Sequence, residues 1–184
     1  MELKGEYQID ASRDAVWAAL NDPDMLRKCI PGCESLERLS DTEFAAKVMA
    51  AIGPVRARFN TSLKLEDLNP PEGYTIVGES KATAGFGRGA ARVMLGESEG
   101  GTLLRYTADF KVGGKLAQVG SRLVLGATKK TADDFFGKFS TELDPGAYRL
   151  VVDDESTGAR GIGRTGLAIG GALIVLLIWW FLLR

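Results

Sequence analysis

Residues 43–112 alternate apolar and polar side chains in five successive runs, and this pattern limits the possible folds more than any other feature of the chain. Successive residues of a strand point to opposite faces, so each run predicts a strand with one buried face and one solvated face. Strands of this kind are typical of an antiparallel sheet. The predicted strands cover residues 43–52, 55–65, 74–82, 88–95 and 102–112, with turns at 69–73 and 99–101.

The region before residue 43 predicts one more strand and two short helices. The strand covers residues 3–9. Ser12 is a favourable N-cap for a helix over residues 13–21, because its hydroxyl can accept a hydrogen bond from a free N–H group of the first turn. Asp22-Pro23 opens the second helix, which must end before Pro31-Gly32.

Residues 115–142 change to a helical period. Apolar residues at every fourth position predict one long helix, and the inner face of the sheet would cover this stripe. The two patterns together predict an α+β domain over residues 1–143. The stripe consists of Val119, Leu123, Ala127, Phe135 and Phe139, and Thr131 interrupts it.

The composition narrows the possible chemistry. The chain has 184 residues, no histidine and a formal net charge of −1. The lack of histidine excludes His-based catalytic triads and His-containing zinc or haem sites, and the balanced charge disfavours nucleic acid as a partner. Cys29 and Cys33 are too few for a zinc site. We therefore expect them to pack at a helix–strand junction rather than to act as a redox pair.

Many residues on the predicted inner face are small, among them Gly78, Ala108 and Ala46. A sheet of this kind beneath a helix has two interpretations, an apolar cavity that binds a ligand and close helix–sheet contact without a void. The residues predicted to line the cavity are Phe59, Ala82, Phe86, Ala91, Val93, Tyr106, Phe110, Leu123 and Ala127.

Three further motifs favour structural roles. Residues 85–89, GFGRG, lead from one strand into another and lack the helix N-terminus of a phosphate site. We expect a bulge or sharp bend there, with Phe86 at the cavity mouth. Asp133 and Asp134 are neighbours on a helix and point apart, so we expect two solvated acids. The outer face of the sheet is either a basic docking surface or an ordinary solvated face; its arginines are Arg56, Arg58, Arg88, Arg92 and Arg105.

Residues 165–183 contain no charged side chain. As a helix with a rise of about 1.5 Å per residue they would span roughly 28 Å, close to the hydrocarbon core of a bilayer. We expect a C-terminal transmembrane anchor over residues 165–184, preceded by a flexible linker over 144–164. The predicted anchoring residues are Leu167, Leu173, Ile174, Leu177, Trp179, Trp180 and Phe181. The charged start of the chain lacks the apolar core of a signal peptide, so we expect the domain at the cytoplasmic face of the membrane.

The run RKCIPGCESL, residues 27–36, resembles the CoxG family of carbon monoxide dehydrogenase subunits. Residues 53–55, 85–87 and 114–120 support the resemblance, which covers about residues 1–142. The family belongs to the START-like (SRPBCC) superfamily. Its helix-grip layout has one strand, two helices, six strands and a last helix, and it implies an antiparallel sheet wrapped around a long C-terminal helix.

The resemblance implies a non-catalytic accessory protein. Members associate with molybdenum-containing carbon monoxide dehydrogenase or a related hydroxylase at the cytoplasmic membrane, and they are linked to recruitment of the enzyme and carriage of a respiratory quinone. For this chain it implies no covalent cofactor and a cavity for menaquinone or ubiquinone. A buried hydroxyl needs a partner, so Tyr106 is either a donor to a quinone carbonyl or an ordinary core tyrosine with a backbone partner. The alternatives are a pure recruitment anchor without a ligand and a START-like cyclase or hydrolase, which the lack of histidine disfavours.

Overall fold

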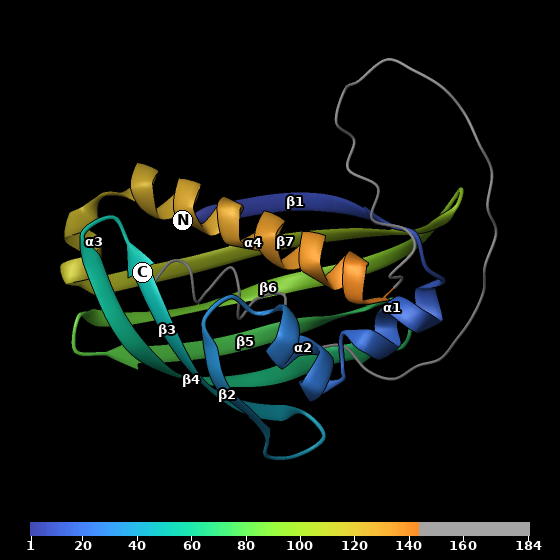
Figure 1. The fold of residues 1–184 in the computed structure, drawn as a ribbon, viewed down its shortest axis with the longest axis horizontal. Helices are drawn as coiled ribbons and strands as arrows, with labels where there is room; N and C mark the ends of the chain where they lie inside the picture. Colours follow the sequence, from blue (N-terminus) through green and yellow to red (C-terminus); the bar gives the residue numbers. More distant parts are fainter. Residues whose placement is uncertain (144–184) are drawn as a thin grey trace.

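The computed structural model describes residues 1–143, and the predicted linker and membrane anchor lie outside these residues. Within them, one antiparallel sheet of seven strands has the order β1-β7-β6-β5-β4-β3-β2 (Figure 1). The strands are β1 (Glu2–Ile9), β2 (Cys33–Arg38), β3 (Glu43–Ile52), β4 (Val55–Asn69), β5 (Gly73–Ala82), β6 (Gly85–Ser98) and β7 (Gly101–Gly114). The helices are α1 (Arg13–Ala19), α2 (Pro23–Cys29), α3 (Lys115–Val119) and α4 (Ser121–Leu143).

The alternating pattern is confirmed, because all five runs form strands whose predicted inner residues face the core. In β3, Phe44, Val48 and Ile52 are buried, whereas Glu43 and Lys47 are exposed. Strands β4 and β6 are longer than predicted. Strand β2 was not among the strands predicted from the pattern, although the layout implied by the family resemblance includes it. The sheet thus has one apolar face and one polar face.

The two short helices begin at the predicted caps. The Ser12 hydroxyl accepts a hydrogen bond from the backbone N–H of Ala15 at 3.3 Å, and the Asp22 carboxylate accepts one from the N–H of Asp24 at 2.9 Å. At the end of α2, the Lys138 ammonium group donates a hydrogen bond to the carbonyl oxygen of Lys28. This contact attaches α2 to α4, and it places a positive charge where the helix dipole is negative.

Helix α4 crosses the inner face of the sheet on the same side as α1 and α2, and no helix within residues 1–143 covers the other face (Figure 1). The single helix predicted over residues 115–142 is wrong, because Gly120, with a φ angle of 95°, separates α3 from α4. The predicted stripe of every fourth residue also drifts around α4, because an α-helix has 3.6 residues per turn. Phe135 and Phe139 are buried as predicted, but Leu123 is 58% exposed.

In the first half of α4, each buried residue comes one position later in the sequence than predicted. Val124 and Thr128 are buried in place of the predicted Leu123 and Ala127. Thr131 belongs to the buried face rather than interrupting it. Thr128 can be buried because its hydroxyl donates a hydrogen bond to the carbonyl oxygen of Val124 at 2.8 Å. No helix within residues 1–143 has the length and the apolar character needed to cross a bilayer. The buried residues of α4 are Val124, Thr128, Thr131, Ala132, Phe135, Phe136 and Phe139.

Candidate functional site

Most of the residues predicted to line a cavity belong to the packed core. Less than 4% of the surface of Phe59, Ala91, Val93, Tyr106 and Phe110 is accessible to water. All five are members of one hydrophobic cluster between the sheet and α4. The inner face is therefore closed beside these side chains, and their role in binding a ligand stays a prediction.

Glycines on the sheet explain why small residues leave little space there. Gly5 pairs with Tyr106 across β1 and β7, and a Cβ atom on Gly5 would lie 2.6 Å from the Tyr106 ring. Gly78 pairs with Leu63 across β4 and β5, and a Cβ atom there would lie 2.6 Å from the Leu63 side chain. Each glycine thus accommodates the larger side chain of its cross-strand partner.

Two of the predicted lining residues face away from the core. Leu123 is exposed because a spacing of four residues drifts around a helix of 3.6 residues per turn, so Leu123 lies almost opposite Phe139 on α4. Phe86 is 45% exposed and shares the outer face with Arg88, which lies two residues further along β6. Its ring lies over Gly113, its partner on β7. The placement of these two residues in the cavity was therefore wrong.

Ala82 and Phe86 instead line an open pocket of about 630 Å³ at the hairpin between β5 and β6. The bulge or bend predicted within residues 85–89 is not found, because the chain turns just before them, at Thr83 and Ala84, and residues 85–89 pair in unbroken register with β5 and β7. Gly85 has a φ angle of 146° and approaches the backbone of Gly113 too closely for a side chain. The pocket is lined by Glu79, Lys81, Ala82, Thr83, Ala84, Gly85, Phe86, Gly114 and Lys115.

A more enclosed groove of about 320 Å³ lies between the C-terminal halves of β1 and α4. Both sides carry apolar and polar groups, such as Ile9 and Gln8 on β1 and Phe136 and Asp133 on α4. No pattern in the sequence predicted this groove. Its lining residues are Tyr7, Gln8, Ile9, Asp10, Ala11, Asp133, Phe136, Gly137, Ser140 and Leu143.

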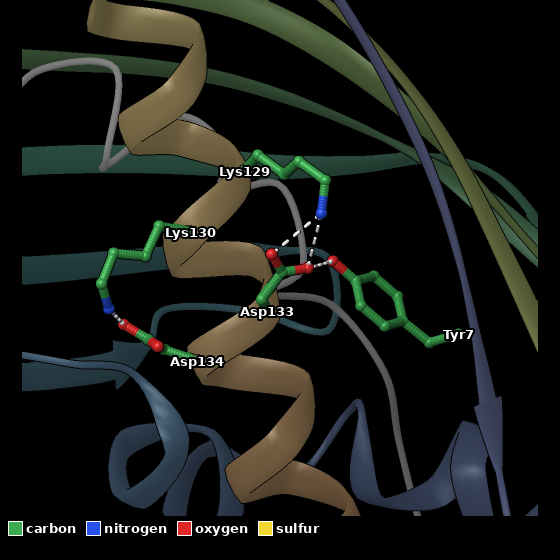
Figure 2. Close-up of polar contacts among 5 residues, drawn as sticks. All are labelled: Tyr7, Lys129, Lys130, Asp133 and Asp134. Atoms are coloured by element: carbon green, nitrogen blue, oxygen red, sulfur yellow. Dashed lines mark hydrogen bonds and ion pairs between the residues drawn. The ribbon is translucent and has the colours of Figure 1, made fainter. Parts of the chain in front are cut away.

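Tyr7 connects the two walls of the groove. Its hydroxyl donates a hydrogen bond to Oδ1 of Asp133 at 2.8 Å, and Lys129 forms an ion pair with the same carboxylate at 2.9 Å (Figure 2). Asp134 points away from Asp133 and pairs with Lys130 (Figure 2). The two acids therefore share no proton, as their adjacent positions on the helix predicted.

The Tyr7 ring closes the inner side of the groove. It stacks on Phe136 with ring centroids 4.0 Å apart and lies parallel to Tyr106 at 6.2 Å. Burial, followed by the nearby Tyr106 and Asp133, raises the pKa of Tyr7 well above its ordinary value of 10.0. Burial also raises the pKa of Tyr106 to about 12. Both hydroxyls thus remain protonated at neutral pH and can act as donors.

Cys29 and Cys33 lie at the junction of α2 and β2, as predicted, and both are free thiols. Burial raises the pKa of Cys29 to about 12 and also raises the pKa of Cys33. Neither thiol is therefore activated as a nucleophile. Within residues 1–143, no three acidic or thiol side chains are arranged to hold a metal ion.

The predicted outer-face arginines are all exposed. Arg58 makes two contacts with the Glu34 carboxylate, at 2.5 and 2.8 Å, and Arg105 pairs with Glu6 at 3.2 Å. The hydrogen bond from Arg58 lowers the pKa of Glu34. These pairs lie in solvent, where such contacts contribute little to stability.

The fold resembles that of several solved structures. A conserved protein from Geobacillus kaustophilus is 30% identical, with a TM-score of 0.74, over 78% of this chain and 95% of that chain. The Zhui aromatase/cyclase from Streptomyces sp. R1128 is 12% identical, with a TM-score of 0.59, over 78% of this chain and 93% of that chain. A protein from Thermus thermophilus, TTHA0849, is 14% identical, with a TM-score of 0.61, over 80% of this chain and 99% of that chain. The latter two likenesses show the helix-grip fold alone.

No curated protein matches this chain. The model of one family, the CoxG subunits of carbon monoxide dehydrogenase, matches residues 5–144. This match spans all four described helices and the whole sheet except the first three residues of β1. The chain therefore belongs to the CoxG family of carbon monoxide dehydrogenase subunits.

Proposed function

We propose that this protein is a non-catalytic accessory protein of a molybdenum hydroxylase of the carbon monoxide dehydrogenase type. It recruits the enzyme to the cytoplasmic face of the membrane and presents a lipophilic respiratory quinone to it. Family membership supports the partner, since the matching family is named after carbon monoxide dehydrogenase. The hydroxylase performs the oxidation, and the quinone takes up two electrons and two protons.

Attachment to the membrane rests on residues 165–183, which contain no charge. Cell fractionation tests this part of the proposal. Removal of residues 165–184 is expected to move both this protein and the hydroxylase to the soluble fraction. Replacement of the segment by an unrelated transmembrane helix is expected to return both to the membrane. A truncated protein that stays in the membrane fraction would contradict the proposed anchor.

The groove between β1 and α4 is the observation that carries the ligand part of the proposal. Its volume of about 320 Å³ is at the lower end of the range for small-molecule sites. A quinone ring can pass through a groove of this volume, but the groove is too small to hold a whole quinone with a long isoprenoid chain. Tyr7 and Phe136, which stack at 4.0 Å, separate the groove from the buried aromatic cluster. In the proposal the groove is the entrance, and these two rings move apart when the ligand enters.

Burial of the lipid supplies the binding energy in this proposal. Each Å² of apolar surface removed from water contributes about 25 cal/mol, so no catalytic group is required. The interior is already packed in the described structure, with Phe59 and Val93 fully buried. The incoming ligand must therefore replace contacts between α4 and the sheet, and this favours a ligand with a large apolar surface.

A matched pair of variants tests the groove. Gly137 lines the groove and Gly126 does not, and both lie in α4 with no atom near the position of a Cβ. Gly137→Phe fills the groove, whereas Gly126→Phe places the same ring elsewhere on the helix. We expect the full chain with Gly137→Phe to lose co-purifying quinone, as measured by mass spectrometry of the extracted lipid, and Gly126→Phe to retain it. Equal quinone content in the two variants would exclude this groove as the entrance.

The recruitment anchor without a ligand is the second candidate function, and the closed inner face favours it. Under this alternative, Gly137→Phe leaves membrane recruitment of the hydroxylase unchanged, and no quinone co-purifies with any variant.

A further inference from the structure

Two buried polar side-chain atoms lack a hydrogen-bond partner among residues 1–143, Nε of Arg13 and the hydroxyl of Tyr74. The Arg13 guanidinium group still uses another nitrogen to pair with Glu97 at 3.1 Å. Tyr74 has no second polar group on its side chain. Of these two side chains, Tyr74 is therefore the one that forms no hydrogen bond at all within residues 1–143.

Tyr74 lies deep in the molecule, on the inner face of β5. It is 2% exposed and shares a row of the sheet with Val93 on β6 and Tyr106 on β7. The Trp17 ring of α1 meets the Tyr74 ring edge-on, with centroids 5.4 Å apart. Burial raises the pKa of Tyr74, so its hydroxyl remains a neutral donor at physiological pH.

Other buried hydroxyls near the core have partners. Thr61 and Ser80 form a hydrogen bond with each other at 2.9 Å, and Thr102 donates to the carbonyl oxygen of Ala11 at 2.8 Å. An unpaired buried hydroxyl destabilises the folded state, and phenylalanine would fill nearly the same space without that cost. A tyrosine at this position is therefore best explained by a partner that is not part of residues 1–143.

We propose that the Tyr74 hydroxyl is the hydrogen-bond donor that recognises a carbonyl oxygen of the bound quinone ring. This inference rests on the proposed function and names the residue that distinguishes a quinone from a hydrocarbon of the same shape. Tyr74 lies three strands from β1, which corresponds to roughly 14 Å at a spacing of about 4.8 Å per strand. The ring thus lies at the inner end of the site, and the isoprenoid chain runs toward the groove at β1.

Menadione and 2-methylnaphthalene test this role, because they have the same bicyclic frame and only menadione carries carbonyl groups. Trp17 becomes the sole tryptophan of the full chain when Trp179 and Trp180 are changed to phenylalanine. Quenching of Trp17 fluorescence then reports binding of menadione in detergent solution, and 2-methylnaphthalene serves as the competitor. We expect Tyr74→Phe to weaken menadione binding about tenfold, the effect of one hydrogen bond, and to leave the competitor's affinity unchanged.

Tyr106→Phe is the comparison variant, since Tyr106 is the competing candidate donor and its hydroxyl lies in the same row of the sheet. If Tyr74 is the donor, Tyr106→Phe weakens menadione binding less than Tyr74→Phe does. Equal binding by Tyr74→Phe and the parent would overturn the role of Tyr74 and leave the proposed quinone function intact. No binding of menadione by the parent would refute both. Loss of binding in Tyr106→Phe alone would assign the donor to Tyr106 instead.

A second measurement does not depend on the ligand. If the Tyr74 hydroxyl is unpaired in the free protein, Tyr74→Phe has a urea midpoint equal to or higher than that of the parent. A lower midpoint with an unchanged m-value would show that the hydroxyl already has a partner, such as a bound water, and would overturn the proposal.

Discussion

The substitution Gly5→Ala tests whether small residues on the sheet make room for neighbouring side chains or for a ligand. Gly5 lies on the edge strand β1 and pairs directly with Tyr106. A Cβ atom on residue 5 would lie 2.6 Å from Cε1 and 2.7 Å from the hydroxyl oxygen of Tyr106. Ordinary contacts are about 3.5–4.0 Å, so the ring or the strand must move by about 1 Å.

The expected magnitude follows from two opposing effects. Overpacking of a closed core costs about 1–3 kcal/mol. Replacement of glycine by alanine within regular structure returns about 0.5–1 kcal/mol, because the unfolded chain loses less conformational freedom on folding. We therefore expect Gly5→Ala to lower the free energy of unfolding by about 1 kcal/mol, within a range of about 0–2.5 kcal/mol. In a Tyr106→Leu background the same change should cost much less, because the rigid ring is gone.

Urea denaturation of the full chain in detergent, followed by circular dichroism, measures this change. Gly126→Ala is the control, since a Cβ atom on Gly126 meets no other atom and the residue is exposed on α4. This control should be stabilised by up to about 1 kcal/mol. Stabilisation of Gly5→Ala by a similar amount would refute the argument, because it would mean that the space over Gly5 is open.

Three other predictions concern the same domain. Val124→Ala should lower the free energy of unfolding by about 2 kcal/mol and Leu123→Ala by less than about 0.5 kcal/mol, since only Val124 is buried. A larger loss of stability for Leu123→Ala than for Val124→Ala in urea denaturation would show that the buried face is the one predicted from the sequence. Lys138→Met should cost about 1 kcal/mol through loss of the contact with the end of α2, and an unchanged urea midpoint would show that this contact contributes nothing. The folded-state pKa values of Tyr74 and Cys29 are raised from ordinary values of 10.0 and 9.0, that of Cys29 to about 12. The folded state therefore holds protons that the unfolded state releases, and stability should be constant below about pH 9 and fall between about pH 9 and 12. Thermal melts across this range would contradict the assignment if the midpoint did not fall.

The faces of the strands could be predicted from the sequence because their period is fixed by backbone geometry. Phe44 and Lys47, for example, are three positions apart, an odd number, and must lie on opposite faces. The same rule places Phe86 on the face of Arg88, and the structure confirms that arrangement. The placement of Phe86 at the cavity mouth failed because it relied on the glycines around it rather than on alternation.

The interior could not be predicted in the same way, because it depends on which residues pair across strands. Gly78 suggested a void, but its partner Leu63 covers it. The register that brings these residues together is set by long-range pairing, and composition does not reveal it. Small residues beneath a helix are therefore compatible with a packed core as well as with a cavity.

The groove was missed for a related reason. Tyr7 and Phe136 come from opposite ends of the domain, and only the pairing of β1 with β7 and the path of α4 bring them together. The stripe predicted for the last helix used a fixed spacing of four residues, which drifts around a helix of 3.6 residues per turn and selects Leu123. A stripe traced backwards from Phe139 with spacings of three and four would have included Phe135, Thr128 and Val124, which are all buried.

Transfer of electrons from the hydroxylase to membrane quinone tests the central proposal most directly. The molybdenum hydroxylase of the same organism, supplied with its own substrate, is mixed with vesicles that contain menaquinone, with and without the full chain. The proposal predicts that menaquinone is reduced when the full chain is present, and that reduction falls at least tenfold when the chain is omitted or when residues 165–184 are removed. Reduction at the same rate without this protein would contradict the proposed coupling.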